Sequence, residues 1–172
     1  MRIGSIGMDL FILRHGDAGR SSVTVKDDSK RSLTVEGEKE IKDISKGIKG
    51  LGIEFDYIFT SPLLRAKQTA ELISKIVVPT NQIKELDELK PEGNKLRLYH
   101  KLSNLKQDSS VLIVGHEPYL SELIGEAISS GKCQIDLKKA GFARIRVTTI
   151  FPKLKGELRW LFTSKHLKRM TR

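Results

Sequence analysis

The sequence predicts an α/β fold, a three-layer α/β/α sandwich with a mostly parallel central sheet and an antiparallel hairpin at its C-terminal end. Residues 10–13 and 111–114 form short, continuous apolar runs, which are typical of parallel strands buried on both faces. Amphipathic helical patterns lie between the apolar runs, and the chain closes with two stretches of alternating polar and apolar residues. With 172 residues the chain suits one ordinary domain, so we expect a single domain over residues 1–172.

The first helix is expected soon after the strand at residues 10–13. Its apolar residues recur at helical spacing: Ile41, Ile44, Ile48 and Leu51. Thr34 is the expected N-cap, because its hydroxyl can accept a hydrogen bond from the first turn. Gly50 or Gly52 is the expected end of the helix. Glutamates and lysines fill the opposite face, so this helix should cover the sheet from the surface.

The remaining elements alternate in the same way. We expect strands at residues 55–61, 111–114, 141–150 and 156–164, and helices at 63–76, 93–105 and 119–130. Pro62 and Pro118 stand at the starts of two of these helices and are natural first-turn residues. The last two strands alternate as an antiparallel pair does, so they form the expected hairpin.

The composition favours anionic partners. The chain has 31 Lys and Arg against 21 Asp and Glu, a formal net charge of +10. These basic residues are scattered, apart from a basic tail at residues 165–172. We do not expect nucleic acid as a partner, because no face pairs aromatic with basic residues.

The cysteine usage and the hydropathy favour a cytoplasmic protein without a membrane association. Cys133 is the single cysteine, so no internal disulfide can form, and no Cys/His spacing suits a structural zinc ion. No segment approaches the ~20 apolar residues that a membrane-spanning helix needs, and the N-terminus lacks the apolar core of a secretory signal. Residues 1–7 are a candidate extension ahead of Met8, and translation from Met1 and from Met8 both stay open.

Charged and titratable residues follow three of the predicted strands. The first strand ends in Arg14, His15, Gly16 and Asp17; the second in Ser61 and Pro62, with Arg65 one turn further; the third in Gly115, His116, Glu117 and Pro118. Ligands of α/β sheets bind beyond the carboxyl ends of the parallel strands. If the three strands are neighbours, two arginines and two histidines meet at one edge of the sheet.

These residue types suit phosphoryl chemistry. Arginine presents a planar set of donors that matches phosphate oxygens, and imidazole is a nucleophile near neutral pH. His15 is the natural nucleophile, because a bond from one ring nitrogen to a backbone carbonyl would leave the other nitrogen free. Gly16 is a candidate both for the tight turn and for a phosphate contact, whereas Ser61 and Gly115 suit turn geometry. No cluster of carboxylates would hold Mg²⁺, so we expect no metal and no cofactor.

Six sequence blocks resemble a known family. The blocks LRHGDA, SPLLRAKQTA and VGHEPYL are similar to the signature of the histidine phosphatase superfamily, which has the phosphoglycerate mutase-like fold. RSLTVEG, DELKPEG and KKAGFARI resemble the short SixA-type phosphohistidine phosphatases. The resemblance runs from about residue 8 to residue 160, so it implies one phosphatase domain over nearly the whole chain.

The resemblance also implies roles for individual residues. His15 would become phosphorylated, Arg14 and Arg65 would hold the phosphoryl oxygens, and His116 would donate to the same group from the opposite side. Arg31 would either add a phosphate contact or be a solvated residue ahead of the helix.

The proton donor is open between two carboxylates. Glu88 lies near the position that ester-cleaving members use, and Asp17 adjoins the nucleophile, but either can equally be a surface carboxylate. A missing acid matters least for phosphohistidine, because imidazole is a good leaving group once it is protonated.

The chain has no room for a large lid insertion. Only 21 residues, 90–110, separate the DEL block from the next strand, so we expect an open pocket that suits a phosphorylated side chain on a partner protein. Two alternatives stay open: a broad phosphomonoesterase acting on small phosphorylated metabolites, and a non-catalytic module that binds phosphate or nucleic acid. The sequence does not indicate the oligomeric state.

Overall fold

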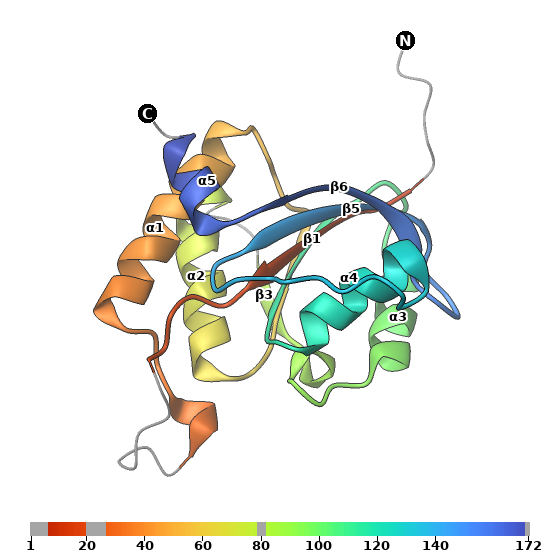
Figure 1. The fold of residues 1–172 in the computed structure, drawn as a ribbon, viewed down its shortest axis with the longest axis horizontal. Coiled ribbons are helices and arrows are strands. Elements are labelled where there is room, and N and C mark those ends of the chain that lie inside the picture. Colours follow the sequence, from red (N-terminus) through yellow and green to blue (C-terminus); the bar gives the residue numbers. More distant parts are fainter. Residues whose placement is uncertain (1–6, 20–26, 79–81, 171–172) are drawn as a thin grey trace.

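The computed structural model describes residues 7–19, 27–78 and 82–170. A six-stranded sheet runs through the molecule in the order β3-β2-β4-β1-β5-β6 (Figure 1). Its strands are β1 (Asp9–Arg14), β2 (Tyr57–Thr60), β3 (Ile83–Glu85), β4 (Ser110–Gly115), β5 (Phe142–Thr149) and β6 (Lys155–Phe162). The first four strands pair in parallel, whereas β5 and β6 form the expected antiparallel hairpin and join the sheet along β1.

Helices cover both faces of the sheet. They are α1 (Val35–Gly50), α2 (Leu64–Val77), α3 (Lys95–Ser103), α4 (Tyr119–Ser129) and α5 (Ser164–Arg169), with short 3-10 turns η1 (Asp28–Lys30) and η2 (Asp87–Leu89). In Figure 1, α1, α2 and α5 lie on one side of the sheet, and α3 and α4 lie on the other. The three-layer α/β/α sandwich is therefore confirmed.

The core consists of two clusters that share the sheet. Along β1, Leu10 and Ile12 pack toward α3 and α4, while Phe11 and Leu13 pack toward α1, α2 and α5. Successive side chains of a strand point to opposite faces, so a strand covered on both sides is apolar throughout. This explains the continuous apolar run at residues 10–13.

The start of α1 agrees with the expected cap. The Thr34 hydroxyl accepts a hydrogen bond from the Gly37 backbone at 2.9 Å, and the helix ends at Gly50. Pro118 is the N-cap of α4 and Pro62 precedes the N-cap of α2, so neither lies in the first turn as expected. The short strand β3 was not expected at all.

The C-terminal segment packs against α1. Within the basic tail, residues 165–169 belong to α5, whose Leu167 is buried and whose Lys168 bonds to Glu40 at 3.0 Å. Residues 171–172, like residues 1–6 of the candidate extension, lie outside the described part of the chain.

Two further expectations concern lids and membranes. Residues 90–110 hold α3, its turns and the first residue of β4, so the structure has no large lid insertion in this segment. Among the helices that the structure describes, none combines the length and the apolar character that crossing a bilayer requires.

Candidate active site

The sheet order places β2, β4 and β1 side by side, with their carboxyl ends at one edge. Arg14 ends β1 and is paired in register with Gly115, the last residue of β4. His15 and His116 come directly after these two residues, and their ring centroids are 5.0 Å apart. The two histidines that lie 101 positions apart in the sequence are therefore neighbours at this edge of the sheet.

The His15 ring is held in one tautomer. Its Nδ1 lies 2.7 Å from the Gly16 carbonyl oxygen. Because a carbonyl can only accept, Nδ1 carries the proton and Nε2 keeps its lone pair. Arg65 Nε donates to that Nε2 at 3.3 Å. The backbone carbonyl that we expected to orient the ring is thus present, and Gly16 supplies it.

Burial keeps this ring neutral. His15 is 7% exposed, and desolvation lowers its pKa to about 4, although the bond to Gly16 acts in the opposite direction. The charges of Arg65 and Arg14 lower the pKa further, because they disfavour a second cation nearby. Near neutral pH the ring therefore has an unprotonated nitrogen available for bonding.

His116 lies beside His15 and is held by Ser61, the residue that follows β2. Its Nε2 lies 2.8 Å from the Ser61 hydroxyl oxygen, which also accepts the Leu63 backbone N–H at 3.3 Å. The residue is 2% exposed, and burial lowers its pKa to about 3, with His15 and Arg65 adding to the effect. Its Nδ1 is buried and has no hydrogen-bond partner among residues 7–19, 27–78 and 82–170.

Asp28 bridges two of the site arginines. Its Oδ2 lies 2.9 Å from Arg65 Nη2, and its backbone oxygen accepts from Arg65 Nη1 at 2.9 Å. Its Oδ1 accepts from Arg31 Nε at 2.8 Å. Arg31 is anchored in turn on the backbone oxygens of Gly19 at 2.9 Å and Ala18 at 3.3 Å.

The ionisation of Asp28 follows from these contacts. Partial desolvation alone would raise its pKa, but the hydrogen bond and charge of Arg31, with the charge of Arg65, outweigh that effect and lower it. The carboxylate is therefore ionised at neutral pH. Arg31 is not a free solvated side chain, since it holds Asp28 beside Arg65.

Arg14, the last residue of β1, contributes a further positive charge beside the two histidines. Its Nη1 donates to the Leu137 backbone oxygen at 2.9 Å, while its Nε is buried without a hydrogen-bond partner in the described part of the chain. Its charge acts on both His15 and His116, where it lowers the pKa. The structure thus gathers Arg14, His15, Arg65 and His116 in one place.

Gly16 lies in tight surroundings. A Cβ at this position would come within 2.8 Å of Ile41 Cγ1, so only glycine fits unless the Ile41 side chain shifts. Its backbone N–H already donates to the Thr69 hydroxyl at 3.2 Å. The local packing therefore accounts for Gly16 without any phosphate contact.

The two candidate acids are bonded to lysines. Asp17 binds Lys139, and that bond is the main cause of its lowered pKa. Glu88 is 13% exposed at its side chain, with Oε1 3.5 Å from Lys101 Nζ in α3. Across the described residues, no hydrogen bond or ion pair connects either carboxylate with His15 or His116.

Comparisons with known proteins decide the family. A model of the histidine phosphatase superfamily (branch 1) matches residues 10–93. Phosphohistidine phosphatase SixA of Escherichia coli is 33% identical over 121 residues, covering 69% of this chain and 73% of that protein. The chain belongs to the histidine phosphatase superfamily, in its SixA-type branch. It is therefore a phosphatase and not a non-catalytic binding module.

Solved structures agree with this membership. The structure of the protein histidine phosphatase SixA complexed with tungstate has a TM-score of 0.79 at 26% identity, and the match covers 93% of this chain and 99% of that one. A phosphoglycerate mutase of Bacillus anthracis has a TM-score of 0.67 at 14% identity, covering 96% and 97% of the two chains. The second likeness shows the phosphoglycerate mutase-like fold.

Sequence reasoning about this histidine phosphatase missed two contacts of the site. Ser61 was assigned to turn geometry alone, yet its hydroxyl bonds to His116. Asp28 was not singled out, although it lies three residues before Arg31, a spacing at which opposite charges meet on a helical turn. No signal in the sequence indicated that Asp28 also reaches Arg65.

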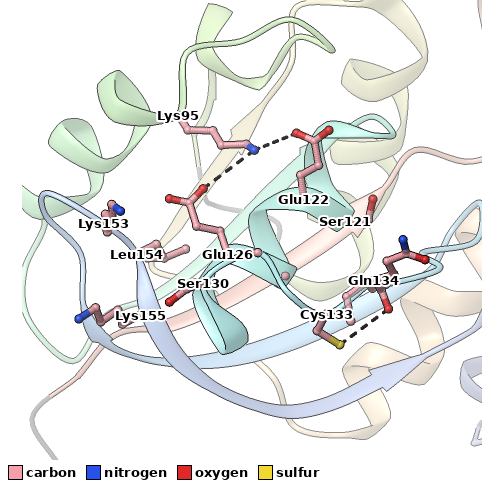
Figure 2. A pocket seen from close by; sticks show the side chains of 13 residues that line it. Lys95, Ser121, Glu122, Glu126, Ser130, Cys133, Gln134, Lys153, Leu154 and Lys155 are labelled. Carbon is pink, nitrogen blue, oxygen red and sulfur yellow. Dashed lines mark hydrogen bonds and ion pairs between the residues drawn. The ribbon is translucent and has the colours of Figure 1, made fainter.

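A separate cavity of about 580 Å³ lies beside α4 in this histidine phosphatase (Figure 2). Its carboxylates, Glu122 and Glu126, face Lys95, whose Nζ is 2.9 Å and 4.0 Å from them. None of the site residues discussed above lines it. In the part of the chain that the structure describes, no group of His, Cys, Asp and Glu is arranged to hold a metal ion.

Proposed function

We propose that this histidine phosphatase removes the phosphoryl group from phosphohistidine in a partner protein, through a phosphohistidine formed on its own His15. The observation that carries the proposal is the state of the His15 ring, with Nδ1 bonded to the Gly16 carbonyl and Nε2 unprotonated beside Arg65. A neutral, oriented imidazole next to a guanidinium suits attack on an anionic phosphoryl group.

The first displacement transfers the phosphoryl group to the enzyme. The Nε2 lone pair of His15 gives up its hydrogen bond from Arg65 Nε and forms a bond to phosphorus. The bond from phosphorus to the substrate nitrogen breaks, and its electron pair stays on that nitrogen. Arg14 and Arg65 bind the phosphoryl oxygens, and His116 donates to the same group from its side. Because these groups are already held in place, little reorganisation is needed during the step.

The second displacement returns His15 to its starting state. A water molecule attacks phosphorus, the bond to His15 Nε2 breaks, and dihydrogen phosphate leaves with the oxygen and both protons of that water. The lone pair returns to Nε2, and the bond from Nδ1 to the Gly16 carbonyl keeps the ring in the same tautomer throughout. The same arginines hold the phosphoryl oxygens in both steps.

Two features support phosphohistidine over a phosphate ester. Asp17 and Glu88 are bonded to Lys139 and Lys101, and among the described residues no hydrogen bond or ion pair connects either with His15 or His116, which favours a substrate that needs no strong acid. Between η2 and β4 the chain forms only α3 and its turns, so this part of the described chain holds no long segment that could enclose a small metabolite. A phosphorylated side chain on another protein fits these conditions, and the Escherichia coli relative is itself named a phosphohistidine phosphatase.

The decisive experiment is to trap the intermediate. The enzyme is mixed with a ³²P-phosphohistidine peptide, quenched within milliseconds, and tested for acid-labile, base-stable label on the peptide that contains His15. We expect label on the wild type and on His100→Ala, whose imidazole is exposed in α3, and none on His15→Ala. EDTA should leave the rate unchanged. Turnover by His15→Ala at the wild-type rate would refute the mechanism, and faster turnover of small phosphate esters would favour a phosphomonoesterase.

A further inference from the structure

Asp28 stands where the phosphate pocket meets solvent. Its side chain is 51% exposed, whereas that of Arg65, to which it is bonded, is 5% exposed. We propose that Asp28 selects the leaving group: its carboxylate accepts a hydrogen bond from the protonated ring nitrogen of the phosphohistidine being cleaved. This inference rests on the function proposed above and adds a specificity-determining residue to it.

The position of the carboxylate follows from the direction of attack. His15 is buried, so a substrate reaches it from the solvent side, and an in-line displacement sends the leaving group away from His15, back toward solvent. A single guanidinium separates Asp28 from the attacking nitrogen, because Arg65 donates from Nε to His15 and from Nη2 to Asp28. Asp28 is thus on the solvent side of the arginine that holds the phosphoryl group.

Substrate binding frees one oxygen of this carboxylate. The phosphoryl oxygens compete with Asp28 for the two terminal nitrogens of Arg65, and a dianion binds that planar group more strongly than one carboxylate does. Asp28 keeps its second anchor, the bond from Arg31 Nε to Oδ1 at 2.8 Å. Oδ2 is then charged, held in place and beside the phosphoryl group.

A phosphohistidine ring can use that oxygen. Its phosphorylated nitrogen leaves readily when the opposite ring nitrogen carries a proton, because the electron pair of the broken bond then completes a neutral imidazole. Asp28 Oδ2 would accept a hydrogen bond from this opposite N–H and keep the proton on the ring until the bond breaks. No proton is transferred in this step, so the ionised state of Asp28 is the competent one.

The same carboxylate acts against phosphate esters. A departing alkoxide or phenolate develops negative charge and carries no N–H for Asp28 to accept. Like charges at short range repel, so Asp28 raises the barrier for esters while it lowers the barrier for phosphohistidine. Preference therefore comes from one residue that attracts the right leaving group and repels the wrong one.

The test is a ratio of two specificity constants. We would measure kcat/KM for a phosphohistidine peptide and for p-nitrophenyl phosphate with the wild type, Asp28→Asn and Asp28→Glu. Asp43→Asn is the control, since it makes the same charge change at a carboxylate paired with Lys46 in α1. Any effect of Asp28 on phosphate binding through Arg65 acts on both substrates and cancels in the ratio.

For Asp28→Asn we expect the ratio of phosphohistidine to p-nitrophenyl phosphate to fall about tenfold, as for the loss of one charge-assisted hydrogen bond. Asp28→Glu should recover part of the ratio, and Asp43→Asn should leave it unchanged. If Asp28→Asn lowered kcat/KM equally for both substrates, Asp28 would only position Arg65. If it raised kcat/KM equally for both, Asp28 would only compete with the phosphoryl group for Arg65. Either result overturns the inference, whereas a wild type inactive on phosphohistidine overturns the proposed function instead.

Discussion

His15 Nε2 accepts a hydrogen bond from Arg65 Nε over 3.3 Å, so the unprotonated nitrogen of the pocket faces a guanidinium. The same guanidinium bonds through Nη1 and Nη2 to Asp28, each at 2.9 Å. One arginine therefore links the nitrogen that we expect to attack with the carboxylate that we expect to face the leaving group.

Replacement of Arg65 by lysine tests the planar donor group. Lysine keeps the charge but presents one ammonium, so it cannot bind two phosphoryl oxygens in one plane. We expect Arg65→Lys to lower kcat/KM for the phosphohistidine peptide about 100-fold. Arg159→Lys is the matched control, because Arg159 is exposed and its one ion pair among the described residues is with Glu157. A loss of less than threefold in Arg65→Lys would contradict the assignment of Arg65.

The buried histidines predict a loss of stability in mild acid. The folded state lowers the pKa of His15 from 6.5 to about 4, so between these values the unfolded chain binds more protons. The contribution of His15 to the free energy of unfolding should therefore be fully present above pH 6.5. It should decrease as the pH falls toward 4. His15 alone corresponds to about 3 kcal/mol over this window.

Urea unfolding at pH 7 and pH 4.5 measures this effect. His15→Gln removes the titrating ring, so its stability should change less between the two pH values than that of the wild type. His100→Gln removes an exposed ring and should behave as the wild type does. If His15→Gln lost as much stability in acid as the wild type, the pKa of His15 would not be lowered.

Ser61 should act through His116. Ser61→Ala removes the oxygen that lies 2.8 Å from His116 Nε2, so the ring loses the partner that sets its orientation and tautomer. We expect kcat to fall roughly tenfold and the ¹⁵N shifts of the His116 ring to change. Ser103→Ala, at an exposed serine of α3, should alter neither. Unchanged ring shifts together with a lower kcat would mean that Ser61 does not work through His116.

Gly16 should be intolerant of a side chain for packing reasons. A Cβ there would meet Ile41 Cγ1 at 2.8 Å in the buried face of α1, so Gly16→Ala should cost about 1–3 kcal/mol of stability. Gly50→Ala is the comparison, since the nearest atom to a Cβ at Gly50 is 4.0 Å away. Denaturant unfolding of both variants checks this, and equal stabilities would contradict the close contact.

Local sequence patterns predicted most of the fold because each pattern has a local cause. The apolar run of β1 and the capping hydroxyl of Thr34 both act within a few residues, so neither depends on distant parts of the chain. The strand β3 was missed because its three residues, Ile83–Glu85, carry two exposed charges and show no periodicity. It exists because β2 offers a free edge for pairing.

The sequence by itself determined that arginines and histidines follow buried strands. Their positions therefore predicted at which edge of the sheet the site lies. Only the tertiary structure decided how those side chains are partnered, since hydrogen bonds and burial join residues far apart in the chain. Asp28 meets Arg65 across 37 positions, and Ser61 meets His116 across 55. The low pKa of His15 likewise comes from desolvation, which exists only once the helices and the sheet have closed around the ring.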